Sequence, residues 1–246
     1  MIILNAGVPR SGTVLVNAIL RELLRRRGVA ARPINAHDAE LPRLVQACGP
    51  SEPSVLLVHT HSWDRESAAS LRGAGCIAFA NHRDPRDVCV SLMRLHDHDF
   101  EAAAEMVLAA FAAFEALRRD LPVTELAYER LVADRRGHIL RIAERLGYAP
   151  SPAEVGEVDR ATSLARHRRV MAQVRAETLP VLVERRNRNR VLLEDPETLI
   201  SDRHIQSGRP GRWRAELDPG QQAEAAALFA DLLPRYGDRT PSTSSI

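Results

Sequence analysis

Residues 2–13 read I-I-L-N-A-G-V-P-R-S-G-T, and a helical pattern of apolar residues follows over residues 13–26. The apolar run at 2–5 predicts a buried strand, and two glycines bracket the loop that joins this strand to the helix. In such a connection, backbone N–H groups and the positive end of the helix surround an anion. The segment therefore predicts a phosphate-binding loop, with a glycine-rich turn that binds nothing as the alternative.

The loop differs from a nucleoside-triphosphate loop in the position of its cation. Both glycines fit the pattern G-x-x-x-x-G-K-[ST] and Thr13 follows the second of them, but the chain contains no lysine and the cation stands earlier, at Arg10. An ATP site also needs an acidic metal ligand, and no strand ends in an obvious aspartate for that role. The loop therefore argues against ATP as the bound nucleotide.

Short apolar runs followed by helical patterns recur along the chain. The predicted strands are 2–5, 54–60, 75–80 and 123–127, and the predicted helices are 13–26, 86–96, 101–119, 137–146 and 221–233. This alternation predicts a P-loop-type α/β fold, a three-layer α/β/α arrangement around a parallel sheet. Residues 151–203 are polar and weakly periodic, which predicts a helical or looped lid without strands. We expect one domain over 1–240 and a flexible tail over 241–246.

The composition limits the class of protein. A net charge of +2 with 45% hydrophobic residues is typical of a folded protein and argues against bulk nucleic-acid binding. The arginine-rich run at 185–190 lacks the aromatics of a nucleic-acid site. Cys48, Cys76 and Cys89 lack metal or disulfide spacing, and there is neither a signal-peptide pattern nor an apolar run of about 20 residues. We therefore expect a cytoplasmic protein without a membrane anchor.

A second segment combines charges and a hydroxyl at a specific spacing. Residues 83–91 read R-D-P-R-D-V-C-V-S. Arg83 at a strand end and Ser91, which follows within a helix, can converge on one phosphate, and Pro85 begins a helix whose dipole favours the anion. A capped helix start alone explains the proline and the aspartates but not the whole spacing. The segment therefore predicts a second phosphate site.

These segments, in this order, resemble motifs of the sulfotransferase family. That family uses 3′-phosphoadenylyl sulfate (PAPS) as donor and yields adenosine 3′,5′-bisphosphate (PAP). Residues 9–13, P-R-S-G-T, are similar to the family's P-K-S-G-T loop, with arginine for lysine. The resemblance implies that Arg10 stabilises charge on the bridging oxygen as the S–O bond breaks. The implied contacts to the 5′-phosphosulfate are Pro9, Arg10, Ser11, Gly12, Thr13 and Val14.

Two further matches concern the rest of the nucleotide. Residues 83–91 resemble the family's 3′-phosphate signature R-[ND]-P-[RK]-D-x-x-x-S, which implies that Arg83 and Ser91 bind that phosphate. Residues 128–134, Y-E-R-L-V-A-D, are similar to Y-E-x-L-x-x-D, whose tyrosine lies near the adenine. Tyr128 is therefore an expected nucleotide contact, although a tyrosine at a strand end is also consistent with core packing.

Two weaker matches lie nearer the C-terminus. Residues 208–213, G-R-P-G-R-W, resemble the family's G-x-x-G-x-W loop, which closes over the 3′-phosphate. The match leaves open whether arginine 209, 212 or 214 supplies the charge. Residues 161–164, A-T-S-L, resemble another nucleotide-contacting stretch, with helix capping as the alternative. The implied contacts are Gly208, Arg209, Gly211, Thr162 and Ser163.

The predicted strand at 54–60 is followed by His61, so that H-T-H occupies 59–61. A hydroxyl nucleophile needs a proton acceptor, and a histidine that titrates near neutrality is suited to this role. Cytosolic family members carry K-T-H here with the histidine as base, which implies His61 as the base. His59 shares its strand face and is a helper or substitute, and a glutamate base is the alternative. We expect no metal, because adjacent side chains in H-D-H-D at 96–99 diverge.

Together these observations predict a sulfotransferase that moves a sulfuryl group from PAPS to a hydroxyl of a small molecule, sugar or natural product. Aromatic residues make up only 4% of the chain, which favours a sugar or natural-product hydroxyl over a phenol. The alternatives are a small-molecule kinase that uses Mg·ATP and a non-catalytic nucleotide-binding module. No nucleic-acid or membrane partner is expected, and the oligomeric state stays open, with a homodimer among the possibilities.

Overall fold

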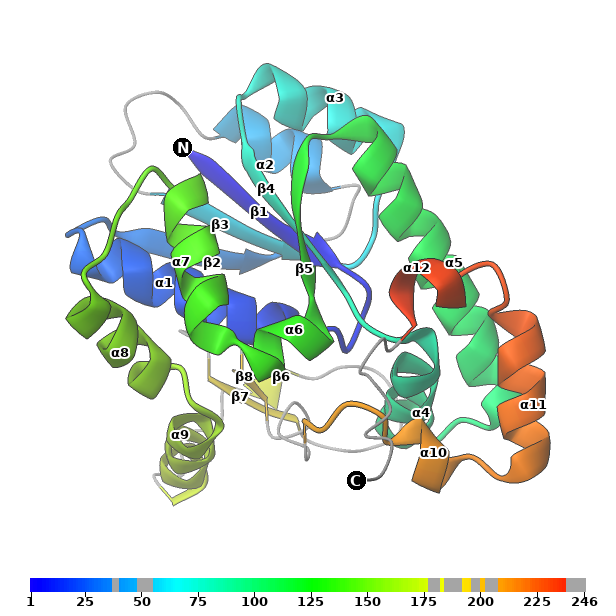
Figure 1. Cartoon of the computed structure of the whole chain (residues 1–246). Coiled ribbons are helices and arrows are strands. Elements are labelled where there is room, and N and C mark those ends of the chain that lie inside the picture. Colours follow the sequence, from blue (N-terminus) through cyan, green and yellow to red (C-terminus); the bar gives the residue numbers. More distant parts are fainter. Residues whose placement is uncertain are drawn as a thin grey trace.

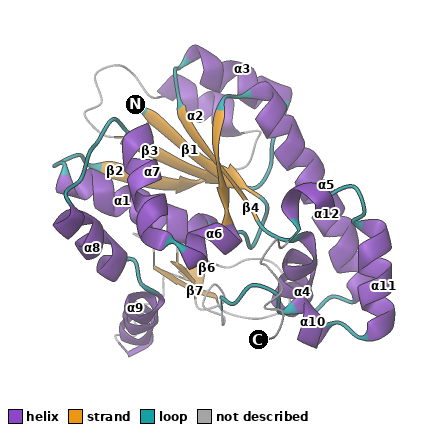
Figure 2. Cartoon of the chain, viewed as in Figure 1, coloured by secondary structure: helices purple, strands orange, loops and turns teal. Residues whose placement is uncertain are grey.

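The computed structural model describes residues 1–36, 40–47, 55–176, 182–183, 192–195, 200–201 and 208–237. A sheet of five parallel strands in the order β2-β3-β1-β4-β5 lies at its centre. The strands are β1 (Ile2–Gly7), β2 (Ala31–Asn35), β3 (Val55–Thr60), β4 (Ile77–His82) and β5 (Val123–Ala127). Helices lie on both sides of this sheet (Figures 1 and 2), which confirms the predicted three-layer α/β/α fold.

Alternate residues of β1 divide the hydrophobic core between the two faces of the sheet. Ile3 belongs to a cluster with side chains of α1 (Thr13–Arg26), α7 (Arg135–Arg145) and α8 (Pro152–Ala161). Leu4 belongs to a second cluster with side chains of α2 (Leu41–Ala47), α3 (Arg65–Gly73), α4 (Pro85–His96) and α5 (Phe100–Asp120). All six residues of β1 are buried, as expected for a central parallel strand covered on both faces.

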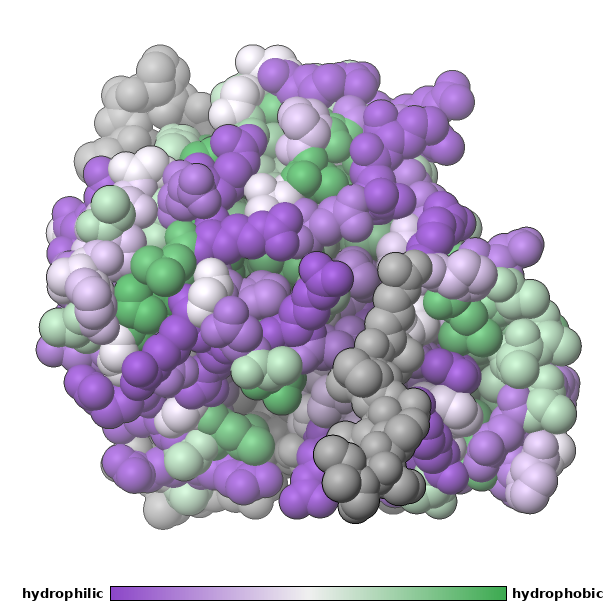
Figure 3. Space-filling view, in the orientation of Figure 1, coloured by the Kyte–Doolittle hydropathy of each residue, from purple (hydrophilic) through white to green (hydrophobic). Residues whose placement is uncertain are grey.

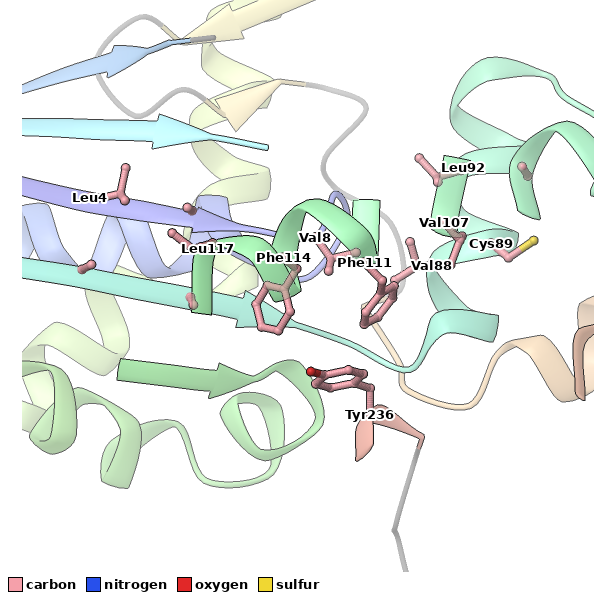
Figure 4. Packing of buried hydrophobic residues seen from close by; sticks show 14 of the residues in the cluster. Leu4, Val8, Val88, Cys89, Leu92, Val107, Phe111, Phe114, Leu117 and Tyr236 are labelled. Carbon is pink, nitrogen blue, oxygen red and sulfur yellow. The ribbon is translucent and has the colours of Figure 1, made fainter. Parts of the chain in front are cut away.

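The last helices are fixed to the second cluster through aromatic packing. These helices are α10 (Trp213–Glu216), α11 (Pro219–Leu228) and α12 (Leu233–Tyr236). The Tyr236 ring packs beside Phe111 and Phe114 (Figure 4), with ring centroids 5.0 Å and 5.7 Å away. The Tyr236 hydroxyl donates to Glu115 and accepts from Arg118 at 3.0 Å. These contacts hold the C-terminal part of the chain against α5, close to the start of α4.

The strand register brings four loops together at the carboxyl ends of the parallel strands. Gly7 at the end of β1 pairs with Asn81 of β4, and His82 pairs with Ala127 at the end of β5. On the other side, β3 ends at Thr60 beside β1. The carboxyl ends of parallel strands are the usual place for ligands in open α/β sheets. The connections after β1, β3, β4 and β5 therefore define the candidate site.

The predictions failed at the edge of the sheet and in the lid region. The sequence missed β2, A-R-P-I-N, because an edge strand tolerates Pro33 and does not need a continuous apolar run. Residues 151–203 were predicted without strands, and this was wrong. They contain β6 (Leu182–Val183), β7 (Leu192–Asp195) and β8 (Ile200–Ser201), an antiparallel sheet whose strands are too short to leave an alternating pattern.

Other predicted elements agree more closely with the structure. The helix predicted at 13–26 is α1 with the same bounds, and α8 and α9 (Leu164–Ala176) supply the helices expected in the lid region. The helix predicted at 221–233 is divided between α11 and α12, whose first turn contains Pro234. A short helix that was not predicted, α6 (Tyr128–Ala133), follows β5. Cys48, the run at 185–190 and the tail at 241–246 lie outside the described residues.

The surface seen in Figure 3 is mostly hydrophilic, with small apolar patches between charged side chains. Val132 and Leu140 are among the larger apolar side chains that stay exposed, at 44% and 47%. Over the described ranges, none of the helices combines the length and hydropathy needed to cross a lipid bilayer.

Candidate active site

The loop after β1 is folded tightly against the end of β4. Val8 N donates to Asn81 O at 2.9 Å. A Cβ atom at Gly7 would lie 2.8 Å from both the N and the Cβ of Asn81, and still closer to its carbonyl oxygen, so only glycine permits this approach. Gly12 precedes α1 at φ +87, where a Cβ would lie 2.7 Å from the Tyr128 ring. The shape of the loop therefore depends on both glycines that the sequence analysis singled out.

The remaining residues of the predicted loop take their expected places between β1 and α1. Ser11 is buried and donates its hydroxyl to Val8 O at 2.6 Å, which tightens the turn. Thr13 and Val14 form the start of α1, and Pro9 lies within the turn that Ser11 N closes on Val8 O. The N-terminus of α1 therefore faces the same space as the loop, as an anion-binding loop requires.

A buried chain of hydrogen-bonded amide side chains supports the loop. The sequence analysis did not identify it. Asn81 Nδ2 donates to Asn5 Oδ1 at 2.5 Å and to Ala6 O at 3.0 Å. Asn5 Nδ2 in turn donates to Asn17 Oδ1 at 2.6 Å and to Thr13 O at 2.8 Å. The three asparagines are at most 1% exposed. They tie β4, β1 and α1 together, and the available signal was the presence of asparagines within apolar stretches.

Arg10 occupies an unfavourable position in the loop. Its φ of +66° is left-handed, a conformation that costs a non-glycine residue free energy. Burial, and then the charges of Arg83 and Arg212, lower the pKa of its guanidinium to about 10. Its Nε donates to Ser91 Oγ at 2.8 Å, so the predicted loop cation meets a predicted phosphate ligand. Strain and like charges gathered at one point are typical of a functional site for an anion.

Arg83 follows β4 and lies next to Arg10. Its guanidinium donates to the Asp87 carboxylate at 3.1 Å, to Arg209 O at 3.1 Å and to Arg10 O at 3.4 Å. It also lies 4.4 Å from the centroid of the Tyr128 ring. The residue is 6% exposed, and its buried Nε has no hydrogen-bond partner among the described residues. A buried N–H without an acceptor is costly, so this atom is suited to hold a ligand oxygen.

The C-terminal segment, residues 208–213, closes the other side of the site. The Tyr128 hydroxyl donates to Gly208 O at 2.6 Å. The Asp87 carboxylate accepts from Gly211 N at 2.7 Å and from Trp213 N at 3.1 Å. The structure thus brings the predicted contacts Gly208, Arg209, Gly211 and Tyr128 together around Arg83.

The three arginines that the sequence left as alternatives differ in their surroundings. Arg212 is one of the charges that lower the pKa of Arg10, and it forms an ion pair with Glu216 at 2.6 Å. Arg214 lies 4.5 Å from the centroid of the Trp213 ring. Arg209 contributes its backbone carbonyl to Arg83 and is otherwise exposed. Of the three, Arg212 is the side chain whose charge acts on the loop cation.

The two predicted base candidates lie at the end of β3. His61 is exposed, and its Nδ1 lies 2.8 Å from Gly7 O. A carbonyl oxygen can only accept a hydrogen bond, so Nδ1 carries the proton and Nε2 of the neutral ring keeps its lone pair. His59 is 9% exposed, with Nδ1 2.8 Å from Asn35 Oδ1, and the two rings meet edge to face at 4.6 Å. The carbonyl of Gly7, at the end of β1, therefore holds His61 in the tautomer whose Nε2 can accept a proton.

Thr162 and Ser163 are placed differently from the other predicted contacts. Thr162 donates its hydroxyl to Val158 O at 2.8 Å, at the end of α8. Ser163 Oγ accepts from Arg166 N at 3.2 Å, at the start of α9. Within the described ranges, no hydrogen bond joins either residue to the loop. Both make the helix-capping contacts that the sequence analysis gave as the alternative.

Glu129 is a further residue that the sequence analysis did not assign to the site. It accepts from Asp84 N at 2.9 Å and so joins the turn after β5 to the turn after β4. Burial raises the pKa of its carboxyl to about 6.

In the described part of the chain, no group of three or more histidine, cysteine, aspartate or glutamate side chains is arranged to hold a metal ion. The rings of His96 and His98 stack on each other at 5.3 Å.

Comparison with known protein sequences gives a limited match. No family model matches the chain. Two curated proteins, an uncharacterized oxidoreductase from each of two Mycobacterium tuberculosis strains, are 31% identical over 132 residues. The match covers 54% of this chain but only 40% of the length of either relative.

Solved structures give a broader match. Mouse sulfotransferase SULT7A1 complexed with PAP has a TM-score of 0.65 at 17% identity, with 95% of this chain and 84% of that chain covered. Retinol dehydratase in complex with androsterone and PAP has a TM-score of 0.65 at 18% identity, covering 98% and 82%. The sulfotransferase domain from the curacin biosynthetic pathway has a TM-score of 0.51 at 13% identity, covering 94% and 97%. The chain therefore has the sulfotransferase fold.

Proposed function

We propose that the protein is a sulfotransferase that moves a sulfuryl group from PAPS to a hydroxyl of a small-molecule acceptor. The observation that carries this proposal is the hydrogen bond from Arg10 Nε to Ser91 Oγ at 2.8 Å. It joins two predicted anion sites that lie 81 residues apart in the sequence. PAPS carries anionic groups at both its 5′ and 3′ positions, so one molecule can occupy two adjoining anion sites. An ordinary nucleoside triphosphate has no 3′-phosphate for the second site.

The donor is proposed to bind with its phosphosulfate on the loop and its 3′-phosphate between Arg83 and Ser91. Loop N–H groups, the start of α1 and Arg10 then face the phosphosulfate. The buried Nε of Arg83 supplies a hydrogen-bond donor for the 3′-phosphate. Tyr128, which packs on Arg83, is the expected neighbour of the adenine. Burial, and then repulsion from Arg83, lower the pKa of Arg10, and an anion between Arg10 and Arg83 offsets both effects.

In the proposed transfer step, the acceptor hydroxyl attacks the sulfur of the donor while its proton passes to a base. His61 is the better candidate, because its exposed ring has the lone pair on Nε2 while His59 is buried. The bond from sulfur to the bridging oxygen breaks, and the electron pair stays on the phosphate of PAP. Arg10 and the loop N–H groups stabilise this developing charge. The sulfated acceptor and PAP are the products.

The curated relatives are named oxidoreductases, which suggests a second candidate function. The spacing of glycines in the loop after β1 and before β4 argues against a dinucleotide-binding oxidoreductase. A dinucleotide-binding turn has the pattern G-x-G-x-x-G between a strand and the helix that follows. The loop after β1 has four residues between Gly7 and Gly12 instead. The related spacing G-A-G-C-I-A at 73–78 leads from the end of α3 into β4, so it precedes a strand and opens no helix.

A transfer assay tests the proposed function. The purified chain is incubated with PAPS in EDTA and a panel of sugar and natural-product hydroxyl compounds, and acceptor-dependent formation of PAP is measured. We expect PAP formation with at least one acceptor, and a loss of 10-fold or more in kcat/KM for Ser91→Ala. Arg25→Gln, which changes an exposed arginine of α1, serves as the control with unchanged rates. Failure of every acceptor would contradict transfer and favour a non-catalytic nucleotide-binding module.

A further inference from the structure

The C-terminal segment (residues 208–213) is attached to the nucleotide-binding side of the molecule through its own backbone. Gly208 O and Arg209 O accept hydrogen bonds from Tyr128 and Arg83, whereas Gly211 N donates to Asp87. The side chains that make these bonds come from α4, α6 and the end of β4. Because the segment contributes backbone atoms, its attachment depends on its conformation more than on its side chains. The positive φ angles of Gly208 and Gly211, +68° and +77°, give it that conformation.

Asp87 is the centre of this attachment. Its carboxylate is fully buried in the first turn of α4 and receives three hydrogen bonds. One oxygen accepts from Gly211 N at 2.7 Å and from the Arg83 guanidinium at 3.1 Å, and the other accepts from Trp213 N at 3.1 Å. A buried carboxylate is stable only when it is paired and hydrogen-bonded, and here both conditions are met by parts of the site. The same carboxylate thus fixes the C-terminal segment and the orientation of Arg83.

We propose that Asp87 is a positioning residue that couples the C-terminal segment to occupancy of the nucleotide site through Arg83. This coupling rests on the proposed function in one respect, because Arg83 is the residue assigned to the donor's 3′-phosphate. A ligand that holds the Arg83 guanidinium also strengthens the arrangement that binds the segment. By reciprocity, a fixed segment holds Arg83 in place for the ligand and slows ligand release. Asp87 therefore controls dissociation of PAP without touching it.

Trp213 offers a spectroscopic signal for this arrangement. The Arg86 guanidinium lies 3.8 Å from the centroid of its ring, and Asp84 holds Arg86 with bonds of 2.6 and 3.0 Å. The chain contains only one other tryptophan, Trp63. In a Trp63→Phe background, fluorescence therefore reports on Trp213 and on the position of the C-terminal segment.

Hydrogen exchange and stopped-flow fluorescence test the proposal on the full chain. In Asp87→Ala, without ligand, we expect the amides of residues 208–213 to exchange at least 10-fold faster. PAP is expected to dissociate at least 10-fold faster from this variant, while its association rate changes less than 3-fold. Asp87→Asn keeps the shape of the side chain and one acceptor oxygen, and we expect intermediate values. This second variant keeps the test decisive if Asp87→Ala does not fold.

Asp99→Ala is the matched control, because Asp99 also accepts from a backbone N–H at a helix start, that of Ala102 in α5. It should leave exchange in 208–213 and PAP dissociation unchanged. Unchanged exchange in the Asp87 variants, or a loss of affinity that arises only from slower association, would overturn the proposal. Exchange in the unliganded protein needs no nucleotide. Faster exchange in Asp87→Ala together with a wild-type protein that binds no PAP would therefore reject the proposed function and keep the positioning role.

Discussion

Replacing Arg10 with glycine should make the unliganded protein more stable while it abolishes transfer. The arginine adopts a left-handed conformation, and its buried guanidinium lies near the charges of Arg83 and Arg212. Glycine adopts the same φ without strain and removes the buried charge. In the proposed function, binding of the anionic donor relieves these unfavourable interactions.

The magnitude follows from three contributions to the free energy of unfolding. Release of the left-handed strain contributes about 1 kcal/mol after the greater flexibility of glycine in the unfolded chain is deducted. The lowering of the Arg10 pKa from its ordinary value to about 10 corresponds to at most about 3 kcal/mol of unfavourable interaction, which solvent screening reduces. Loss of the hydrogen bond to Ser91 costs about 1 kcal/mol. The net expectation for Arg10→Gly is a gain of about 1–2 kcal/mol.

This gain should not depend on pH between 6 and 8, because Arg10 is charged in both the folded and the unfolded chain there. Its lowered pKa means that the contribution of Arg10 to stability becomes more favourable with rising pH only above about 10, where the folded protein releases this proton first. Urea denaturation followed by circular dichroism, without ligand, measures the difference. Transfer by Arg10→Gly should fall by about 100-fold or more, as for loss of a transition-state charge partner.

Asp97→Gly is the control, because Asp97 is the other non-glycine residue with positive φ among the described residues, at +57°, and it ends α4. It should gain no more than about 1 kcal/mol, from strain alone. Addition of PAP should raise the free energy of unfolding of the wild type by more than it raises that of the Arg10→Gly variant. An Arg10→Gly variant less stable than the wild type without ligand would refute the view of Arg10 as a strained cation that awaits an anion.

Three further changes have defined outcomes. His61→Asn should leave PAP binding intact and remove the rise of kcat with pH that deprotonation of the base produces, and an unchanged pH profile of kcat would move the base to His59 or a carboxylate. Gly7→Ala should lose about 3 kcal/mol of stability in urea denaturation because its Cβ would collide with the backbone of β4. Gly28→Ala, whose Cβ meets nothing within 4 Å, should lose only about 1 kcal/mol, and equal losses would contradict the collision. Burial lowers the pKa of His82 to about 4, so the folded state loses up to about 2 kcal/mol as pH falls from 7 to 5. Denaturation of His82→Gln should show a smaller loss over that range, and the same acid sensitivity as the wild type would reject this assignment.

Local signals were sufficient for much of the fold. The strands β1, β3, β4 and β5 and the helices α1, α4, α5 and α7 have apolar runs or 3.6-residue periodicity, and each was predicted within a few residues of its observed bounds. The shorter helices α2, α3 and α6 were not predicted. The spacing from Arg83 to Ser91 predicted a phosphate site because a strand end and a helix face have fixed geometries. The edge strand β2 was missed because Arg32 and Pro33 interrupt its apolar residues.

Contacts between distant segments could not be predicted in the same way. Asp87 belongs to the quoted motif, yet its bond to Gly211 joins residues 124 positions apart. The bond between Glu129 and Asp84 spans 45 positions and depends on the adjacent placement of β4 and β5. The buried asparagines likewise acquire their role only when β1, β4 and α1 meet. Such positioning residues are determined by tertiary structure, and a single sequence gives no spacing rule for them.

The central claim is that the site binds a nucleotide with phosphates at both the 5′ and 3′ positions and needs no metal. Calorimetric titration with PAP in EDTA, beside a titration with Mg·ATP, tests this claim most directly. We expect PAP to bind in EDTA, at least 10-fold more tightly than Mg·ATP, with most of that preference lost in Arg83→Gln. Preference for Mg·ATP would contradict the account and favour a kinase, and the absence of PAP binding would remove the basis for the proposed donor.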